Sequence, residues 1–330
     1  MVEHACIAIG IDRYARLQPL RYAQADALAF QTCVAIAAKI PEERRWLLAE
    51  TAPMRGGRST YPILENIERS LDEISTLALQ PEDILWCFFC GYGVNIFGKD
   101  YLMPIDGNPD EIQTTGISVE TFFNRLQQAN AKNLRVFFDI SRPTGRYAGA
   151  GIGSETLELA YQLDITVMLS CRPSQFARET SALDRGLFTA ALLEALDSWQ
   201  YTTWEALEAY MSDRLPQLCD HHWRPQQNPV TVIRPTDRLH QPLFPAGETV
   251  VPPKEISKEE PKTDPQPNRE PDSDARIDTN AATRQTRGHW LWVGGMAIAI
   301  LLLGVSIARE ISSPDRSPSE NSSETQGFDR

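Results

Sequence analysis

The chain has 330 residues, of which 42% are hydrophobic, and its formal net charge at pH 7 is -12. This length accommodates one large domain with a sizeable core and further appendages. The acidic balance argues against a general nucleic-acid-binding protein, which needs a basic face to collect phosphates.

Strands alternate with helices along the first 240 residues. We expect strands at residues 5–10, 45–49, 84–90, 134–140, 164–170 and 230–234, and helices at residues 20–39, 61–79, 118–129, 185–199 and 203–218. Ser118 is the expected N-cap of the third helix. This alternation favours right-handed crossovers and a mostly parallel sheet with helices on both faces. Residues 1–240 are therefore predicted to form an α/β domain with three layers and about six strands.

The longest apolar strand is expected within the stretch Asp83 to Asp106. Ile84–Cys90 is an unbroken apolar run, which is typical of a strand buried on both faces. We expect this strand to stop at residues 90–93, where paired glycines make a tight turn, and a small hairpin to follow over residues 95–101. Because open α/β sheets place their ligands at the carboxyl ends of strands, Tyr92 is predicted to lie in a cleft.

Composition changes near the end of this domain. Residues 241–289 mix proline with charged and small polar residues, so we expect a disordered linker. Residues 290–308 are apolar over about 19 residues, or ~28 Å of helix, which predicts a single membrane-spanning helix. Residues 309–330 are an expected disordered tail. Arginines preceding the span and a start without a signal-peptide pattern favour a cytoplasmic large domain, which we expect.

The six cysteines show no metal-ligand spacing, and several lie in apolar strands. They are predicted to be buried, reduced thiols, as is usual in a reducing cytosol. The cysteines are Cys6, Cys33, Cys87, Cys90, Cys171 and Cys219.

Several sequence segments, in a fixed order, carry the functional signal. They are IAIGIDRYARLQPLRYAQADA, WCFFCGYGVNIFGKDYLMPIDG, RVFFDISRPTG, ITVMLSCRPSQFARE with GLFTAALLEAL, and QQNPVTV. Together they resemble the caspase-like domains of the bacterial metacaspase, or orthocaspase, type. In that family the corresponding segments are the first strand and helix, the catalytic-histidine segment, the nucleophile segment, the strand and helix lining the substrate pocket, and the last segment. The resemblance covers about residues 3–235 and implies a caspase-like fold.

The chain departs from the family at its two catalytic positions. Tyr92 stands where the family has histidine, and Ser141 stands where it has the nucleophilic cysteine. Cysteine–histidine proteolysis needs a thiolate that the imidazole helps to generate. A tyrosine has a reference pKa near 10, so removing its proton at pH 7 costs roughly 4 kcal/mol. We therefore expect a degenerate dyad without peptidase chemistry.

The resemblance also implies a binding pocket. Asp139 matches the acidic residue that helps the family to hold arginine or lysine side chains, and the alternative is a strand-end carboxylate bonded to backbone. Cys171 and Gln175 lie in the segment similar to the pocket-lining one. Asp12 is either part of a buried pair with Arg13 near the site or a turn residue.

An acidic loop contains Asp106, Asp110 and Glu111. Some relatives need Ca²⁺, but a solvated surface is favoured for so few carboxylates. We therefore predict no metal ion and no cofactor.

Two functions from different classes follow. The first is a membrane-tethered caspase-like pseudo-peptidase that binds a peptide or protein carrying basic residues and does not cleave it. The alternative is an active endopeptidase or hydrolase that cleaves after arginine or lysine with Ser141 as nucleophile. A nucleotide-binding domain is excluded because residues 10–13 lack a glycine-rich phosphate loop. We favour the first, with a peptide or protein partner, a membrane anchor and no nucleic acid.

Overall fold

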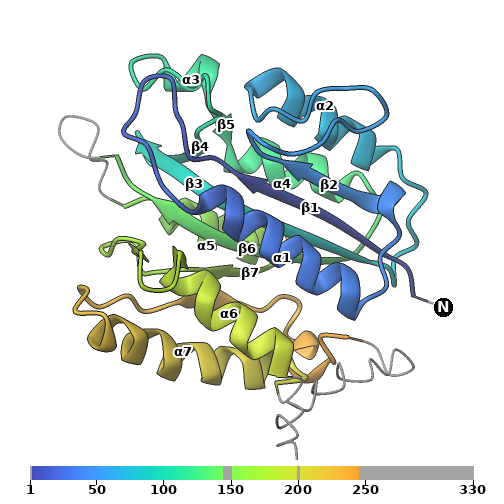
Figure 1. Cartoon of the computed structure of the whole chain (residues 1–330). Coiled ribbons are helices and arrows are strands. Elements are labelled where there is room, and N and C mark those ends of the chain that lie inside the picture. Colours follow the sequence, from blue (N-terminus) through green and yellow to red (C-terminus); the bar gives the residue numbers. More distant parts are fainter. Residues whose placement is uncertain (1, 144–150, 199–200, 245–330) are drawn as a thin grey trace, which may run out of the picture. The chain divides into compact units, whose positions relative to one another are not determined.

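The computed structural model describes residues 2–143, 151–198 and 201–244, all within one unit, Met1–Ile256 (Figure 1). The predicted membrane span at residues 290–308, the tail and nearly all of the linker lie outside the described residues. Within the three described ranges, none of the helices has the length and apolar character that crossing a bilayer requires. The described part is an α/β structure with a mostly parallel sheet, as the strand–helix alternation predicts.

Six strands form the main path of the sheet, in the order β10-β7-β6-β3-β1-β2. They are β1 (His4–Gly10), β2 (Arg45–Leu48), β3 (Ile84–Ile96), β6 (Asn133–Ser141), β7 (Thr166–Leu169) and β10 (Val230–Val232). All neighbours pair in parallel except β10, which is antiparallel to β7. Short antiparallel strands β4 (Lys99–Leu102) and β5 (Ile117–Ser118) extend from β3, and β8 (Glu179–Thr180) pairs with β9 (Arg185–Gly186) separately.

Helices cover both faces of the sheet and give three layers (Figure 1). One face carries α1 (Ala23–Ala37), α6 (Leu187–Ser198) and α7 (Trp204–His221); the other carries α2 (Leu64–Ser75), α4 (Val119–Gln127) and α5 (Ser154–Gln162). Other helical segments of the described residues are α3 (Ile112–Thr115) and the 3-10 turns η1 (Glu42–Arg44) and η3 (Thr236–His240). No sequence pattern predicted α5.

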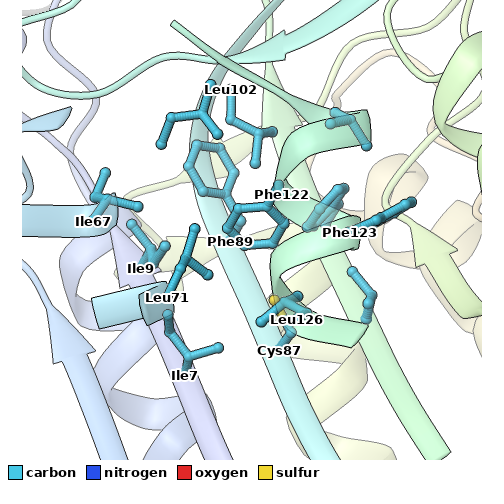
Figure 2. Packing of buried hydrophobic residues seen from close by; sticks show 14 of the residues in the cluster. Ile7, Ile9, Ile67, Leu71, Cys87, Phe89, Leu102, Phe122, Phe123 and Leu126 are labelled. Carbon is cyan, nitrogen blue, oxygen red and sulfur yellow. The ribbon is translucent and has the colours of Figure 1, made fainter. Parts of the chain in front are cut away.

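The alternation of apolar residues along β3 builds two separate cores. Leu85, Cys87 and Phe89 face one helical layer, whereas Trp86 and Phe88 face the other. Figure 2 shows aromatic and aliphatic side chains of α2 and α4 packed over β1 and β3 in the first core. Each fully buried aromatic or aliphatic side chain contributes about 1.5–3 kcal/mol. β3 is therefore buried on both faces.

The central strand is longer than expected, and the predicted turn at residues 90–93 is wrong. β3 runs through these residues and pairs with β4 beyond them. A Cβ atom on Gly91 would lie 2.4 Å from the Tyr14 hydroxyl oxygen, and one on Gly93 would lie 2.5 Å from Ile140 Cγ2. Neither glycine has a positive φ. Glycine is therefore required here for close approach of neighbours and not for a turn.

Carboxylates from distant loops set where two helices begin. α1 begins at Ala23, whose N–H donates to Asp12 Oδ1 over 2.7 Å. α2 begins at Leu64, whose N–H donates to Asp106 Oδ1 over 3.0 Å. Both helices therefore begin three residues later than predicted. The expected N-cap is confirmed, because the Ser118 side chain accepts from the N–H of Thr121.

Candidate functional site

A cleft with a volume of about 410 Å³ lies at the carboxyl ends of β3 and β6. Tyr92 and Ser141 both line it. The two residues are partners in the parallel register of β3 and β6, which are neighbouring strands. The sheet therefore brings Tyr92 and Ser141 to one surface.

Tyr92 is held as a neutral phenol. Its side chain is only 5% exposed, and its ring meets the Tyr14 ring edge-on at 5.0 Å between centroids. Its backbone N–H donates to the Tyr14 hydroxyl oxygen over 2.7 Å. Burial, and next the charge of Glu179, raise the pKa of Tyr92. The phenol therefore stays protonated at neutral pH and cannot act as a general base.

Ser141 ends β6 and is half-buried. Among the described residues, no histidine lines the cleft around it. His4 instead accepts from Trp86 Nε1 at the amino end of the strands, and His240 pairs with Glu205. A serine hydroxyl without a positioned base is a weak nucleophile.

Asp139 is more deeply buried than Ser141, with 3% of its surface exposed. Its Oδ2 accepts from Thr189 Oγ1 over 3.4 Å, while Oδ1 has no hydrogen-bond partner. Burial raises the pKa of Asp139 to about 7, and the nearby hydroxyl groups of Ser170 and Thr189 oppose this rise. The carboxyl group is therefore divided between its charged and neutral forms near pH 7.

Asp26 from α1 is a second buried carboxyl group that the sequence analysis did not single out. It is 1% exposed; its Oδ2 accepts from the N–H of Gly186 over 2.9 Å, and its Oδ1 has no partner. Burial, and next the charge of Asp139, raise the pKa of Asp26 well above its ordinary value. The available signal was a carboxylate on the apolar face of α1, four residues before Phe30.

We name Asp26 and Asp139 the acid pair. Ligand atoms of the pair and of Cys90 all lie within 4.8 Å of one another, so these three residues could hold a metal ion or a cationic group. A Cβ atom on Gly186 would lie 2.8 Å from an oxygen of each carboxyl group. Glycine in β9 therefore lets the backbone close over the pair. In the described part of the chain, neither carboxyl group lines the cleft itself.

Four arginines line the cleft: Arg21, Arg142, Arg178 and Arg224. We name it the arginine cleft. The one carboxylate on its described wall is Glu179, whose Oε2 accepts from the N–H of Arg21 over 3.2 Å. The electrostatic character of this wall is therefore positive, which the sequence did not indicate.

The other predicted site residues have local structural partners. Asp12 caps α1 and also accepts from Gln24 Nε2. Gln175 Oε1 accepts from the N–H of Asn228 over 2.9 Å. Cys171 is buried, and burial raises the pKa of its thiol to about 11. None of the three lines the arginine cleft as described.

All six cysteines are free, and all but Cys33 are buried, as predicted.

In comparisons with known proteins, no family model and no curated protein matches this chain. Interpretation of the site therefore depends on its own chemistry. That chemistry consists of a neutral phenol, a serine without a base, a buried acid pair and an arginine-lined wall.

Proposed function

We propose that the chain is a membrane-tethered caspase-like pseudo-peptidase, which binds a peptide or protein with basic residues and leaves it intact. The observation that carries this proposal is the placement of Tyr92 opposite Ser141 at the mouth of one cleft. A family-type hydrolysis would need an imidazole and a thiolate at these two positions, and both are replaced. The cleft, with a volume of about 410 Å³, is large enough to bind side chains of a peptide.

The acid pair supports recognition of a basic side chain. Two buried carboxyl oxygens, one on Asp26 and one on Asp139, lack donors. A guanidinium carries five N–H donors and an ammonium carries three, so either group satisfies both oxygens and neutralises their charge. Because Gly186 covers the pair, a ligand side chain reaches it by displacing the β8–β9 ribbon.

The membrane tether is supported by the sequence alone. Residues 290–308 form an apolar stretch of about 19 residues, long enough to cross a bilayer as a helix. Deleting residues 290–330 is expected to convert a membrane-bound protein into a soluble, folded one. Sedimentation of the truncated protein with membranes would contradict this part of the proposal.

Peptide binding by the full chain in detergent tests the binding function. The probes are fluorescein-labelled alanine-based peptides that contain one arginine, one lysine or the uncharged isostere norleucine. The basic peptides are expected to raise the anisotropy at lower protein concentration. Asp139→Asn is expected to remove the preference, at about 1.5–3 kcal/mol, the usual contribution of a hydrogen bond to a charged group.

Mass spectrometry of the same mixtures tests the absence of hydrolysis. The peptides are expected to remain intact after long incubation. Cleavage after arginine or lysine that Ser141→Ala abolishes would overturn the proposal and establish the hydrolase instead.

A further inference from the structure

We propose that the arginine cleft is an anion subsite for an acidic residue of the bound peptide. This inference rests on the proposed function and adds a second requirement to its ligand: a carboxylate beside the basic side chain. The cleft has four arginines on its described wall against the single carboxylate of Glu179.

The positive charge of the described wall is only partly balanced by Glu179. In the described part of the chain, none of the ion pairs involves any of the four arginines. Glu179 is hydrogen-bonded to the backbone N–H groups of Arg21 and Tyr22. A positive cleft in a chain of net charge -12 is a local feature and does not follow from composition.

Two of the arginines are built into the protein and are not merely surface side chains. Arg142 is 6% exposed, and its Nη2 donates to the carbonyl oxygens of Ile152 and Arg172 over 3.4 and 3.2 Å. Its guanidinium lies 5.2 Å from the Phe176 ring, and that of Arg178 lies 5.4 Å from the same ring. The ring therefore fixes two guanidinium groups along one wall.

Both of these arginines retain a buried donor. Nε of Arg142 and Nε of Arg178 are shielded from solvent and have no acceptor. An unsatisfied buried donor is costly, and a carboxylate with two acceptor oxygens is the group that guanidinium donors pair with best. The missing acceptors point to a ligand anion at the Phe176 wall.

The spacing between the two subsites follows from β6. Asp139 and Ser141 point to the same side of the strand and are about 6.6 Å apart along it, because side chains alternate. A peptide in extended conformation has the same repeat. The acidic residue of the ligand is therefore expected one or two positions from its basic residue.

The size and the charge of the site favour a peptide over a nucleic acid. A volume of about 410 Å³ accommodates a few side chains, and the net charge of -12 repels an extended polyanion. A phosphorylated side chain presents the same acceptor chemistry as a carboxylate. The experiment below separates these two sources of the anion.

Anisotropy titrations of the full chain in detergent test the inference. Five labelled peptides share an alanine background and contain Lys with Glu, Lys with Gln, norleucine with Glu, Lys with phosphoserine, or neither charge. Replacing Glu by Gln is expected to weaken binding about tenfold, and added salt is expected to reduce the difference. A phosphoserine peptide that binds more tightly than the Glu peptide would also support the anion subsite and would identify phosphate as its preferred group.

Two protein variants locate the effect. Arg178→Gln and Arg224→Gln are each expected to reduce the advantage of Glu over Gln while leaving the advantage of Lys over norleucine unchanged. Arg224 is exposed, so its variant keeps the test valid if Arg178→Gln folds poorly. Arg58→Gln is the matched control, because Arg58 is exposed and lies on α2's side of the domain, paired with Glu73.

The outcomes separate this inference from the function on which it rests. If Lys peptides bind through Asp139 equally well with Glu or Gln, the anion subsite is overturned and the proposed function stands. If Glu peptides bind through the arginines equally well with Lys or norleucine, the anion subsite stands and the basic preference is overturned. Failure of every peptide to bind would overturn both.

Discussion

Two buried ionisable groups on β6 differ in how far their polar atoms have hydrogen-bond partners. Arg135, near the amino end, is 1% exposed, donates to the carbonyl oxygens of Leu243 and Pro242, and lies 4.8 Å from the Trp86 ring. Asp139, near the carboxyl end, is buried to a similar degree but leaves one oxygen without a partner. The same strand therefore carries one satisfied group and one unsatisfied group.

This difference supports a structural role for Arg135 and the proposed binding role of Asp139. The Arg135 guanidinium ties the segment at residues 242–244 to the sheet, and burial lowers its pKa to about 9, so it remains charged at pH 7. The carboxyl group of Asp139 has one long hydrogen bond, from Thr189 Oγ1 over 3.4 Å, and lies close to the carboxyl group of Asp26. Natural proteins satisfy most buried polar groups, so the unpartnered oxygens of Asp26 and Asp139 support the proposed binding of a cationic side chain.

The largest predicted effect comes from removing Arg135, the buried group of β6 that has hydrogen-bond partners. Arg135→Ala is expected to destabilise the domain by about 3–5 kcal/mol, because it leaves a cavity and removes the donors to the carbonyl groups of Pro242 and Leu243. Urea unfolding followed by tryptophan fluorescence measures this change. Arg58→Ala, which removes a mostly exposed arginine, is the control and is expected to have little effect. Equal unfolding midpoints for the two variants would contradict the structural role.

The next-largest effect comes from replacing Asp139, the buried group of β6 that has one oxygen without a partner. The pKa of Asp139 is about 7 in the folded state, against an ordinary value of 3.8, so the folded state holds the extra proton between these two pH values. Stability from this group is therefore lost as the pH rises from about 4 to 7. Asp139→Asn is expected to stabilise the domain at pH 8 by about 2–4 kcal/mol. Unfolding at pH 5 and pH 8 checks this; an equal effect at both values would contradict it.

His4, the first residue of β1, is expected to change the stability of the domain with pH in the opposite direction. Burial, and next the charge of Arg135, lower the pKa of His4 from 6.5 to about 4. The unfolded state then binds the extra proton between these values, so stability is lost as the pH falls through this range. The loss between pH 7 and pH 5 is about 2 kcal/mol.

A substitution that keeps the acceptor isolates this contribution. His4→Gln can still accept from Trp86 Nε1 but does not titrate. It is expected to flatten the stability profile between pH 7 and pH 5, whereas the decline above pH 5 caused by Asp139 remains. An unchanged acid-side profile in His4→Gln would contradict the assignment.

The smallest predicted effect concerns the cleft. Tyr14→Phe removes the acceptor of the Tyr92 N–H and is expected to cost about 1 kcal/mol. Tyr92→Phe keeps this bond and the ring contact, so its stability is expected to change by less than about 0.5 kcal/mol. A larger loss in Tyr92→Phe than in Tyr14→Phe would show that the phenol group of Tyr92 has a structural partner.

The sequence predicted the elements better than the chemistry between them. Apolar strand runs and the Ser118 cap are local signals, and they gave the parallel pairing that brings Tyr92 and Ser141 together. The continuation of β3 through Gly91 depends on the distant Tyr14 hydroxyl, so a turn and a close approach look identical in sequence.

The arginine cleft was unpredictable for a related reason. Its arginines come from four separate segments, and only the tertiary structure brings them to one wall. Asp26 could have been identified from the sequence, because a carboxylate on an apolar helix face is unusual. Its meeting with Asp139 depends on the packing of α1 against the sheet, which no local pattern specifies.

Proton release on peptide binding tests most directly whether the acid pair is the ligand site. Isothermal titration of the full chain with the Lys–Glu peptide at pH 7, in buffers with different ionisation enthalpies, gives the number of protons exchanged. A cation beside Asp139 lowers its pKa below 7, so binding is expected to release about half a proton or more, and to leave the peptide intact. Asp139→Asn is expected to reduce this release. Binding without proton release, or release accompanied by peptide cleavage, would contradict the account.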